Sequence, residues 1–222
     1  MTPEGLVRHL LREHPGRVAV LSSFGAEAAV LLHLVAGIDR AMPVLFLETG
    51  KHFPETLAYR AALASRLGLR DVRDLLPDPA LLAGLDPDGT LWSRAPDQCC
   101  ALRKVFPLDA ALEGFDVLLD GRKRHHGAER TALQAVRQED GKLRVSPLAL
   151  WDSVHIAAYR AEHDLPDHPL FARGYASIGC APCTSPTRPG EPPRAGRWRG
   201  TGKTECGIHH TPSRNDNNKA LT

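Results

Sequence analysis

Short apolar runs alternate with amphipathic segments along the first half of the chain. Residues 17–21 and 43–47 are apolar runs of strand length, and each is followed by a segment with apolar positions at helical spacing, over 28–35 and 54–67. Strands and helices that alternate in this way are typical of a parallel sheet covered by helices. The pattern predicts an α/β fold with a doubly wound, mostly parallel sheet, and ligands at the carboxyl ends of its strands.

The remaining pattern is less regular. It predicts helices over 3–14 and 153–162, a weak strand at 72–75, and strands over 115–119 and 143–147. Residues 77–97 are rich in Pro, Asp and Gly and are expected to form loops with short helical turns, and a helix begins at 98 that Pro107 interrupts or ends. After Pro166 little regular structure is expected. The predicted organisation is one domain over 1–183 and a flexible C-terminal tail over 184–222.

Composition narrows the class of protein. The 222 residues are 42% hydrophobic and 24% charged, which is ordinary for a single globular domain, and a net charge of +2 gives no reason to expect nucleic-acid binding. There is no apolar run of 18 residues and no signal-peptide pattern at the N-terminus, so we expect a cytoplasmic protein without a membrane segment. Positive charge is concentrated at 122–124 and 188–203, where it could hold a small anion.

The loop after the first predicted strand is made of small residues. It reads Ser22-Ser23-Phe24-Gly25-Ala26-Glu27 and leads into the next helix. Free backbone N–H groups and a helix N-terminus can cradle an anion in such a loop. A plain connection between strand and helix would look the same, so the loop alone does not decide between them.

Five cysteines form two pairs and a single residue. The pairs are Cys99-Cys100 and Cys180-Ala181-Pro182-Cys183. In a reducing compartment this arrangement favours metal binding or catalysis over disulfides. Four thiolates suit zinc or an iron–sulfur cluster, and adjacent cysteines fit the separate irons of a cluster better than one tetrahedral ion. Four unrelated buried cysteines remain the alternative.

The fifth cysteine, Cys206, lies in a glycine-rich segment close to bases and histidines. Lys203, His209 and His210 favour its thiolate, which is the nucleophilic form, whereas Glu205 opposes it. From these neighbours alone, Cys206 is either a catalytic nucleophile or an exposed thiol without a role.

Taken together, six segments resemble one family. The chain resembles the assimilatory sulfonucleotide reductases, in particular the cluster-containing adenylyl-sulfate (APS) reductases, which are related to the phosphoadenylyl-sulfate (PAPS) reductases. The segments that carry the resemblance run in order along residues 18 to 210: Ser22 to Glu27, Glu48-Thr49-Gly50-Lys51-His52-Phe53-Pro54-Glu55-Thr56, Cys99-Cys100-Ala101-Leu102-Arg103-Lys104, Cys180-Ala181-Pro182-Cys183-Thr184, Arg194-Ala195-Gly196-Arg197-Trp198 and Lys203-Thr204-Glu205-Cys206-Gly207-Ile208-His209.

The resemblance implies a fold like that of the adenine nucleotide α-hydrolases. It also implies a two-step reaction that reduces APS. It implies that Cys206 attacks the sulfur of APS, displaces AMP and becomes an S-sulfocysteine, from which thioredoxin or a similar dithiol protein releases sulfite. It also implies a [4Fe–4S] cluster on Cys99, Cys100, Cys180 and Cys183. The chain carries no thioredoxin-like domain of its own, so the reductant is expected to be a separate partner.

The resemblance also implies a set of substrate-binding residues. Lys104, Arg194 and Arg197 are expected at the phosphate and sulfate, where guanidinium groups can form paired hydrogen bonds. The other expected contacts are Ser22, Ser23, Phe24, Gly25, Glu27, Glu48, Thr49, Gly50 and Arg124. Three positions depart from the family pattern: Glu48 stands in place of Asp, and His126 and Gly127 stand in place of Gln and Ser. His52, His125 and His126 are expected to be surface or hydrogen-bonded histidines rather than ligands.

Other functions fit parts of the sequence. The same scaffold could reduce PAPS, although relatives specific for PAPS generally lack the four cluster cysteines. An adenylating enzyme of the same superfamily would need a Ser-Gly-Gly-x-Asp-Ser loop, and residues 22–27 lack its second glycine and its aspartate. An iron–sulfur redox sensor would give no reason for Cys206 to lie beside substrate-binding bases. The sequence leaves open a homo-oligomer and the role of the cluster.

Overall fold

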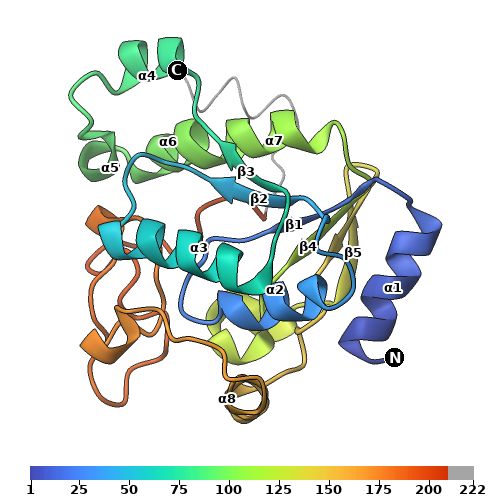
Figure 1. The fold of residues 1–222 in the computed structure, drawn as a ribbon. Helices are drawn as coiled ribbons and strands as arrows, with labels where there is room; N and C mark the ends of the chain where they lie inside the picture. Colours follow the sequence, from blue (N-terminus) through green and yellow to red (C-terminus); the bar gives the residue numbers. More distant parts are fainter. Residues whose placement is uncertain (210–222) are drawn as a thin grey trace.

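The computed structural model describes residues 1–209, apart from the side chains of residues 128 and 129, and contains one mixed sheet (Figure 1). Its strand order is β3-β2-β1-β4-β6-β5, and every neighbouring pair is parallel except β5 with β6. The strands are β1 (Val18–Leu21), β2 (Val44–Leu47), β3 (Val72–Leu75), β4 (Val117–Asp120), β5 (Val136–Glu139) and β6 (Lys142–Val145). The predicted α/β class with a mostly parallel sheet is confirmed.

Helices cover both faces of the sheet (Figure 1). The α-helices are α1 (Pro3–Glu13), α2 (Ala28–Ala36), α3 (Pro54–Leu67), α4 (Pro79–Leu85), α5 (Leu91–Arg94), α6 (Pro96–Cys100), α7 (Phe106–Leu112) and α8 (Ser153–Glu162). Helical turns of other types are the π-helix η1 (Ala101–Val105) and the 3₁₀ turns η2 (Arg124–His126), η3 (Ala128–Ala132), η4 (Phe171–Arg173) and η5 (Ala181–Cys183).

Alternate residues of β1 face two different cores. Val18 and Val20 join a core that includes residues of α1, α2, α3 and α8, whereas Ala19 and Leu21 join a smaller core with α7. This follows from the two-residue period of a strand, and burial on both faces explains why the strand is apolar throughout. The apolar cores thereby fix the sheet, and with it the edge at which its strands end.

The sequence prediction missed β5. Its residues alternate between exposed and half-buried positions, so it lacks the continuous apolar run of the central strands. Asp140 and Gly141 connect β5 to β6, and both have positive φ angles, 49° and 74°. Two such residues form the tight turn that an antiparallel hairpin requires, and an Asp-Gly pair is its sequence signal. The dipeptide was therefore the available evidence for this edge strand.

Pro107 does not end the helical stretch that contains the paired cysteines. The stretch runs from α6 through η1 into α7, and Pro107 lies in the first turn of α7. In a regular α-helix the proline ring would clash with the carbonyl four residues earlier, at Arg103. The wider turn of the π-helix directly before α7 accommodates it. The helical stretch therefore continues past Pro107, so the expected ending is wrong, whereas the α-helical pattern is interrupted as expected, by η1.

Residues 166–209 contain only short 3₁₀ turns and one isolated antiparallel bridge, between Thr184 and Arg197. The expectation of little regular structure after Pro166 is confirmed. Trp198 in this segment is only 5% exposed, so residues beyond 183 pack against the body of the protein. The division at residue 183 and the mobility of the tail remain predictions, and residues 210–222 lie outside the described part.

Within residues 1–209, the longest helices are too short or too polar to cross a membrane. A cytoplasmic location remains a prediction.

Candidate active site

A pocket lies at the carboxyl ends of β1, β2 and β4. It contains about 1260 Å³ of space, part of it open to solvent. Leu21, Leu47 and Asp120 are the last residues of these three strands, and all three line it. Segments from residues 176–180, 193–198 and 205–209 contribute the opposing walls. The pocket therefore occupies the place that the sheet topology predicts for a ligand.

The structure brings many of the predicted residues to this pocket. Those that line it are Ser22, Ser23, Gly25, Glu27, Lys104, Cys180, Arg194, Arg197 and Cys206. Those outside its lining are Phe24, Glu48, Thr49, Gly50, Cys99, Cys100, Arg124 and Cys183. Phe24 is fully buried and packs edge-on against Phe46, with ring centroids 5.7 Å apart. Arg124 turns away, and its Nε donates to the carbonyl of Leu133 at 2.8 Å.

The loop after β1 approaches residue 178 closely. A Cβ atom at Gly25 would lie 3.3 Å from the carbonyl oxygen of Ile178, and the Ser22 hydroxyl accepts from the Phe24 N–H at 3.2 Å. Glu27 at the end of the loop is paired with the buried Lys123, 2.8 Å away. Burial raises the pKa of Glu27, but His126 and Lys123 outweigh it and hold the pKa well below its usual range.

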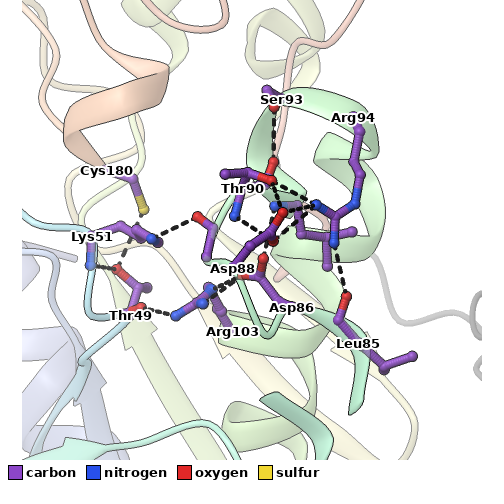
Figure 2. Close-up of polar contacts among 12 residues, drawn as sticks. Thr49, Lys51, Leu85, Asp86, Asp88, Thr90, Ser93, Arg94, Arg103 and Cys180 are labelled. Carbon is purple, nitrogen blue, oxygen red and sulfur yellow. Dashed lines mark hydrogen bonds and ion pairs between the residues drawn. The ribbon is translucent and has the colours of Figure 1, made fainter. Parts of the chain in front are cut away.

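A buried arginine, Arg103, holds the loop after β2 in place (Figure 2). Arg103 of η1 forms an ion pair of 2.5 Å with Asp86 and donates to the carbonyl of Thr49 at 2.7 Å. The Thr49 hydroxyl in turn lies 3.4 Å from the sulfur of Cys180. Glu48 accepts a hydrogen bond from the N–H of Gly50 at 2.7 Å, which shapes the same turn. These residues therefore support the cysteine segment instead of lining the pocket.

The two cysteine pairs lie near one another, and Lys104 lies close to three of the four thiols, those of Cys100, Cys180 and Cys183. Burial raises the pKa of Cys180, but the charge of Lys104 and the Thr49 hydrogen bond outweigh it and lower this pKa. Lys104 is itself buried, which lowers its pKa, but the charges of Cys180, Cys206 and Cys100 raise it above its usual range. An ammonium group beside several sulfurs stabilises thiolates, which are the forms that bind metals. The donor set therefore fits a thiolate-bound metal group.

The spacing of these cysteines can be compared with the geometry of a zinc site. Four sulfurs around one zinc ion would lie about 3.8 Å apart, given tetrahedral bonds of about 2.3 Å. Within residues 1–209, no three cysteine sulfurs lie within 4.8 Å of one another. A cluster that offers a separate iron to each sulfur suits this wider spacing better than a single ion.

A carboxylate and two histidines form another group with metal-binding atoms. Atoms of Glu27, His125 and His126 lie within 4.8 Å of one another. The Glu27 carboxylate already forms an ion pair with the Lys123 ammonium. His125 is hydrogen-bonded to the carbonyl of Trp151, and His126 is hydrogen-bonded to Glu27. His52 is likewise hydrogen-bonded, to the carbonyl of Leu47 at 2.9 Å. The expectation of hydrogen-bonded histidines is confirmed.

Arg197 has a free hydrogen-bond donor in the pocket, judged by residues 1–209. Its guanidinium stacks on Trp198 at 4.5 Å, and its Nε has no hydrogen-bond partner within residues 1–209. Gly179 makes room for it, because a Cβ atom there would lie 2.2 Å from Nη2 of Arg197. A buried donor without a partner costs free energy, so this side chain is suited to an anionic ligand.

Cys206 is half-buried, and its neighbours on both sides are held. Glu205 pairs with Arg130 at 2.7 Å, and Ile208 packs against the smaller core. Nδ1 of His209 lies 3.8 Å from Asp120 at the end of β4, and burial lowers the pKa of His209 to about 4. The geometry thus places a thiol in a pocket that is also lined by Lys104, four arginines and the loop after β1.

Sequence reasoning missed several residues of this pocket. They include His52, Asp120, His126, Arg130 and His209, none of which was expected to bind substrate. The run of bases at 122–124 was noted as an anion-binding candidate, but it is Arg122 and Lys123 that line the pocket, not Arg124. For Arg130 there was no local signal, since its carboxylate partner is 75 residues away.

The fold of this chain is shared with solved structures of other proteins. A solved structure, the phosphoadenylyl-sulfate reductase from Candida auris, has a TM-score of 0.70 and 24% identity, covering 83% of this chain and 91% of that one. An FMN adenylyltransferase from Candida glabrata has a TM-score of 0.61 and 14% identity, covering 99% and 80%. These likenesses show an α/β fold of the adenine nucleotide α-hydrolase type.

Sequence comparison then identifies the family. The model of the phosphoadenosine phosphosulfate reductase domain matches residues 17–186. Adenosine 5'-phosphosulfate reductase from Mesorhizobium japonicum is 49% identical, covering 86% of this chain and 76% of that protein. The relative of this name from Deinococcus radiodurans is 43% identical, covering 93% and 81%. Phosphoadenosine 5'-phosphosulfate reductase from Gloeobacter violaceus is 36% identical, covering 94% and 89%. The chain belongs to the phosphoadenosine phosphosulfate reductase family.

Proposed function

We propose that this chain is an APS reductase of assimilatory sulfate reduction, which converts APS to sulfite and AMP. The observation that carries the proposal is the position of Cys206 in the same pocket as Lys104, Arg194 and Arg197. A sulfonucleotide brings a phosphate and a sulfate, and these three cations are suited to hold them. The loop from Ser22 to Glu27, at the end of β1, is suited to the nucleotide.

In the first step the Cys206 thiolate attacks the sulfur of the sulfate group. A bond forms between the two sulfur atoms, and the bond from sulfur to the phosphate oxygen breaks, so that AMP leaves with the electron pair. Lys104, Arg194 and Arg197 neutralise the charge that develops on the phosphate. The product on the enzyme is an S-sulfocysteine.

In the second step thioredoxin or a similar dithiol protein attacks the Cys206 sulfur. Sulfite leaves with the electron pair of the sulfur–sulfur bond, and the second thiol of the partner resolves the mixed disulfide. The dithiol is oxidised to a disulfide, and its two electrons account for the reduction of sulfate to sulfite. No other reductant is needed for the balance.

We also propose that Cys99, Cys100, Cys180 and Cys183 hold a [4Fe–4S] cluster. When bound, it would fasten α6 to η5 and place a negatively charged group beside Lys104. Purified anaerobically, the protein should contain about four irons and as many sulfides per chain. Zinc without sulfide would contradict this assignment, and Cys183→Ser should lower the iron content.

We propose APS rather than PAPS as the substrate. Relatives named as APS reductases are 43% and 49% identical to this chain, and the one named as a PAPS reductase is 36% identical. The four cysteines also favour APS, because relatives specific for PAPS generally lack them.

Steady-state kinetics with each sulfonucleotide test the function. Sulfite release is measured anaerobically with thioredoxin and either APS or PAPS, and Cys206→Ser is the matched control. The proposal predicts a higher kcat/KM for APS and no turnover in the variant. Turnover of PAPS alone would support the PAPS reductase hypothesis, and no turnover of either by cluster-containing protein would favour a redox sensor.

A further inference from the structure

Glu205, the residue before Cys206, is clamped by two arginines from different parts of the chain. Arg130 of η3 donates from Nε to Oε1 at 2.7 Å and from Nη2 to Oε2 at 3.1 Å. Arg194 lies 3.2 Å from Oε2, and its Nη2 donates to the Thr204 carbonyl at 2.8 Å. All three charged side chains are at most 15% exposed. A paired hydrogen bond with so little solvent is stronger than a surface ion pair.

Arg130 also connects the clamp to the loop after β1. Its Nη1 lies 3.3 Å from Nδ1 of His126, and Nε2 of His126 lies 3.0 Å from Oε2 of Glu27. Because arginine can only donate, Nδ1 of His126 accepts and Nε2 carries the proton toward Glu27. A continuous chain of polar contacts therefore runs from the residue beside Cys206 to the loop that lines the opposite side of the pocket.

We propose that the Arg130–Glu205 ion pair is a latch that positions Cys206 for attack and releases it once the sulfur has been transferred. This inference rests on the proposed function. A protein dithiol cannot enter a pocket of this size, so the S-sulfocysteine must move outward before it is resolved. Arg130 and Glu205 are thus positioning residues, and they act on the reaction through Cys206.

The chemistry of the first step explains why the latch would open afterwards. Transfer places a sulfonate anion on Cys206, directly beside the Glu205 carboxylate. The two anions then compete for the same guanidinium groups, and like charges this close repel each other. Separating an ion pair costs little free energy when both charged groups become solvated. It costs far more when one charged group stays buried without its partner. Opening with both partners reaching water is therefore accessible at modest cost.

Alkylation of Cys206 tests the latch without any substrate. The anaerobically purified holoenzyme is treated with iodoacetamide, and the rate at the Cys206 peptide is followed by mass spectrometry in wild type, Glu205→Gln, Arg130→Met and the double variant. We expect each single variant to react about tenfold faster or more. The double variant should be little faster than the singles, because both changes break one contact.

Two features of this experiment distinguish a change in the position of Cys206 from a change in the pKa of its thiol. Loss of the Glu205 charge would favour the thiolate and loss of the Arg130 charge would disfavour it, so electrostatics alone would move the two rates in opposite directions. Glu191→Gln is the matched control, because Glu191 pairs with Arg199 in the same segment but does not contact Glu205. Its rate should equal that of wild type, and the visible absorbance of the cluster should be unchanged in every variant.

Single-turnover measurements then connect the latch to the reaction. With APS and no dithiol, formation of the Cys206 adduct should slow about tenfold in Glu205→Gln and Arg130→Met. Release of sulfite from a preformed adduct should proceed at least as fast as in wild type. Unchanged alkylation and adduct formation in both variants would overturn the latch and leave the proposed function intact. No adduct on wild-type Cys206 would overturn the proposed function and, with it, the role given to the latch.

Discussion

The sheet region, residues 1–165, and the C-terminal region, residues 166–209, are held together in different ways. The sheet region has two large apolar cores, in which the strands and their covering helices share buried aliphatic and aromatic side chains, and a smaller apolar cluster around Leu91, Cys99 and Leu102. The C-terminal region contributes few residues to these cores. It is held by a small apolar cluster, in which Leu170 and Ile178 pack with Ala26, and by turns, ion pairs and cations stacked on Trp198. The candidate nucleophile, Cys206, and two of the candidate anion-binding arginines, Arg194 and Arg197, belong to this second region.

Because the two regions are held together differently, we expect them to be sensitive to different kinds of substitution. Apolar burial is roughly proportional to area and has no direction, so the sheet region should respond to lost volume. Contacts in the C-terminal region depend on single atoms: a Cβ at Gly196 would lie 2.0 Å from the carbonyl oxygen of Ser185. This region should respond to small changes of shape and charge, and it should do so in activity more than in stability.

The largest expected effect is the loss of a buried ring from the sheet region. Phe46 of β2 is fully buried and packs against Phe24, so Phe46→Ala should lower the free energy of unfolding by about 3–5 kcal/mol. Urea denaturation measures it, with Leu81→Ala as the control, since Leu81 is 37% exposed. Similar losses in the two variants would contradict the idea that volume in the cores holds this region.

A smaller effect, confined to activity, is expected at Gly179. Its Cβ would collide with the end of the flexible Arg197 side chain, so the arginine would move out of the pocket while the backbone stays in place. Gly179→Ala should lower kcat/KM about 100-fold with little change in melting temperature. Gly202→Ala is the matched control, because nothing lies within 4 Å of a Cβ there. If Gly179→Ala lowered the stability as much as Phe46→Ala, the proposed difference between the two regions would be wrong.

The smallest effect concerns the joint between the regions. His168 is fully buried, lies 3.0 Å from the Thr56 hydroxyl of α3, and burial lowers its pKa to about 4 from the usual 6.5. The unfolded chain therefore takes up a proton below pH 6.5 while the folded protein does not. Stability should fall by about 2 kcal/mol between pH 7 and pH 5 on this account.

The comparison of His168→Gln with wild type isolates this histidine. Both proteins are melted at pH 7 and pH 5, and the contributions of all other groups cancel in the difference. The variant should lose less stability on acidification than wild type. An equal loss in both proteins would show that His168 takes up its proton in the folded state as readily as in the unfolded chain.

Much of the sheet region could be predicted from the sequence, because its central strands are apolar on both faces. The exception, β5, lies at the edge of the sheet and carries polar residues, so only its Asp140-Gly141 turn marks it. The π-helix η1 had no signal except Pro107 itself. The place of the pocket followed from the parallel topology alone.

The C-terminal region could be predicted as a set of motifs but not as an arrangement. Arg194, Arg197 and Cys206 were expected to act together, and they line one pocket. Glu205 was expected to oppose the Cys206 thiolate, but Arg130 and Arg194 compensate its charge. Since these partners are distant in sequence and lie in segments without periodicity, no local pattern could reveal the compensation.

The most direct test of the central claim is the mass of the Cys206 peptide after anaerobic incubation with APS and no dithiol. We expect a gain of one SO3 group on this peptide and release of an equal amount of AMP. An adduct on another cysteine, or AMP release without an adduct, would contradict the assignment of Cys206 as the nucleophile.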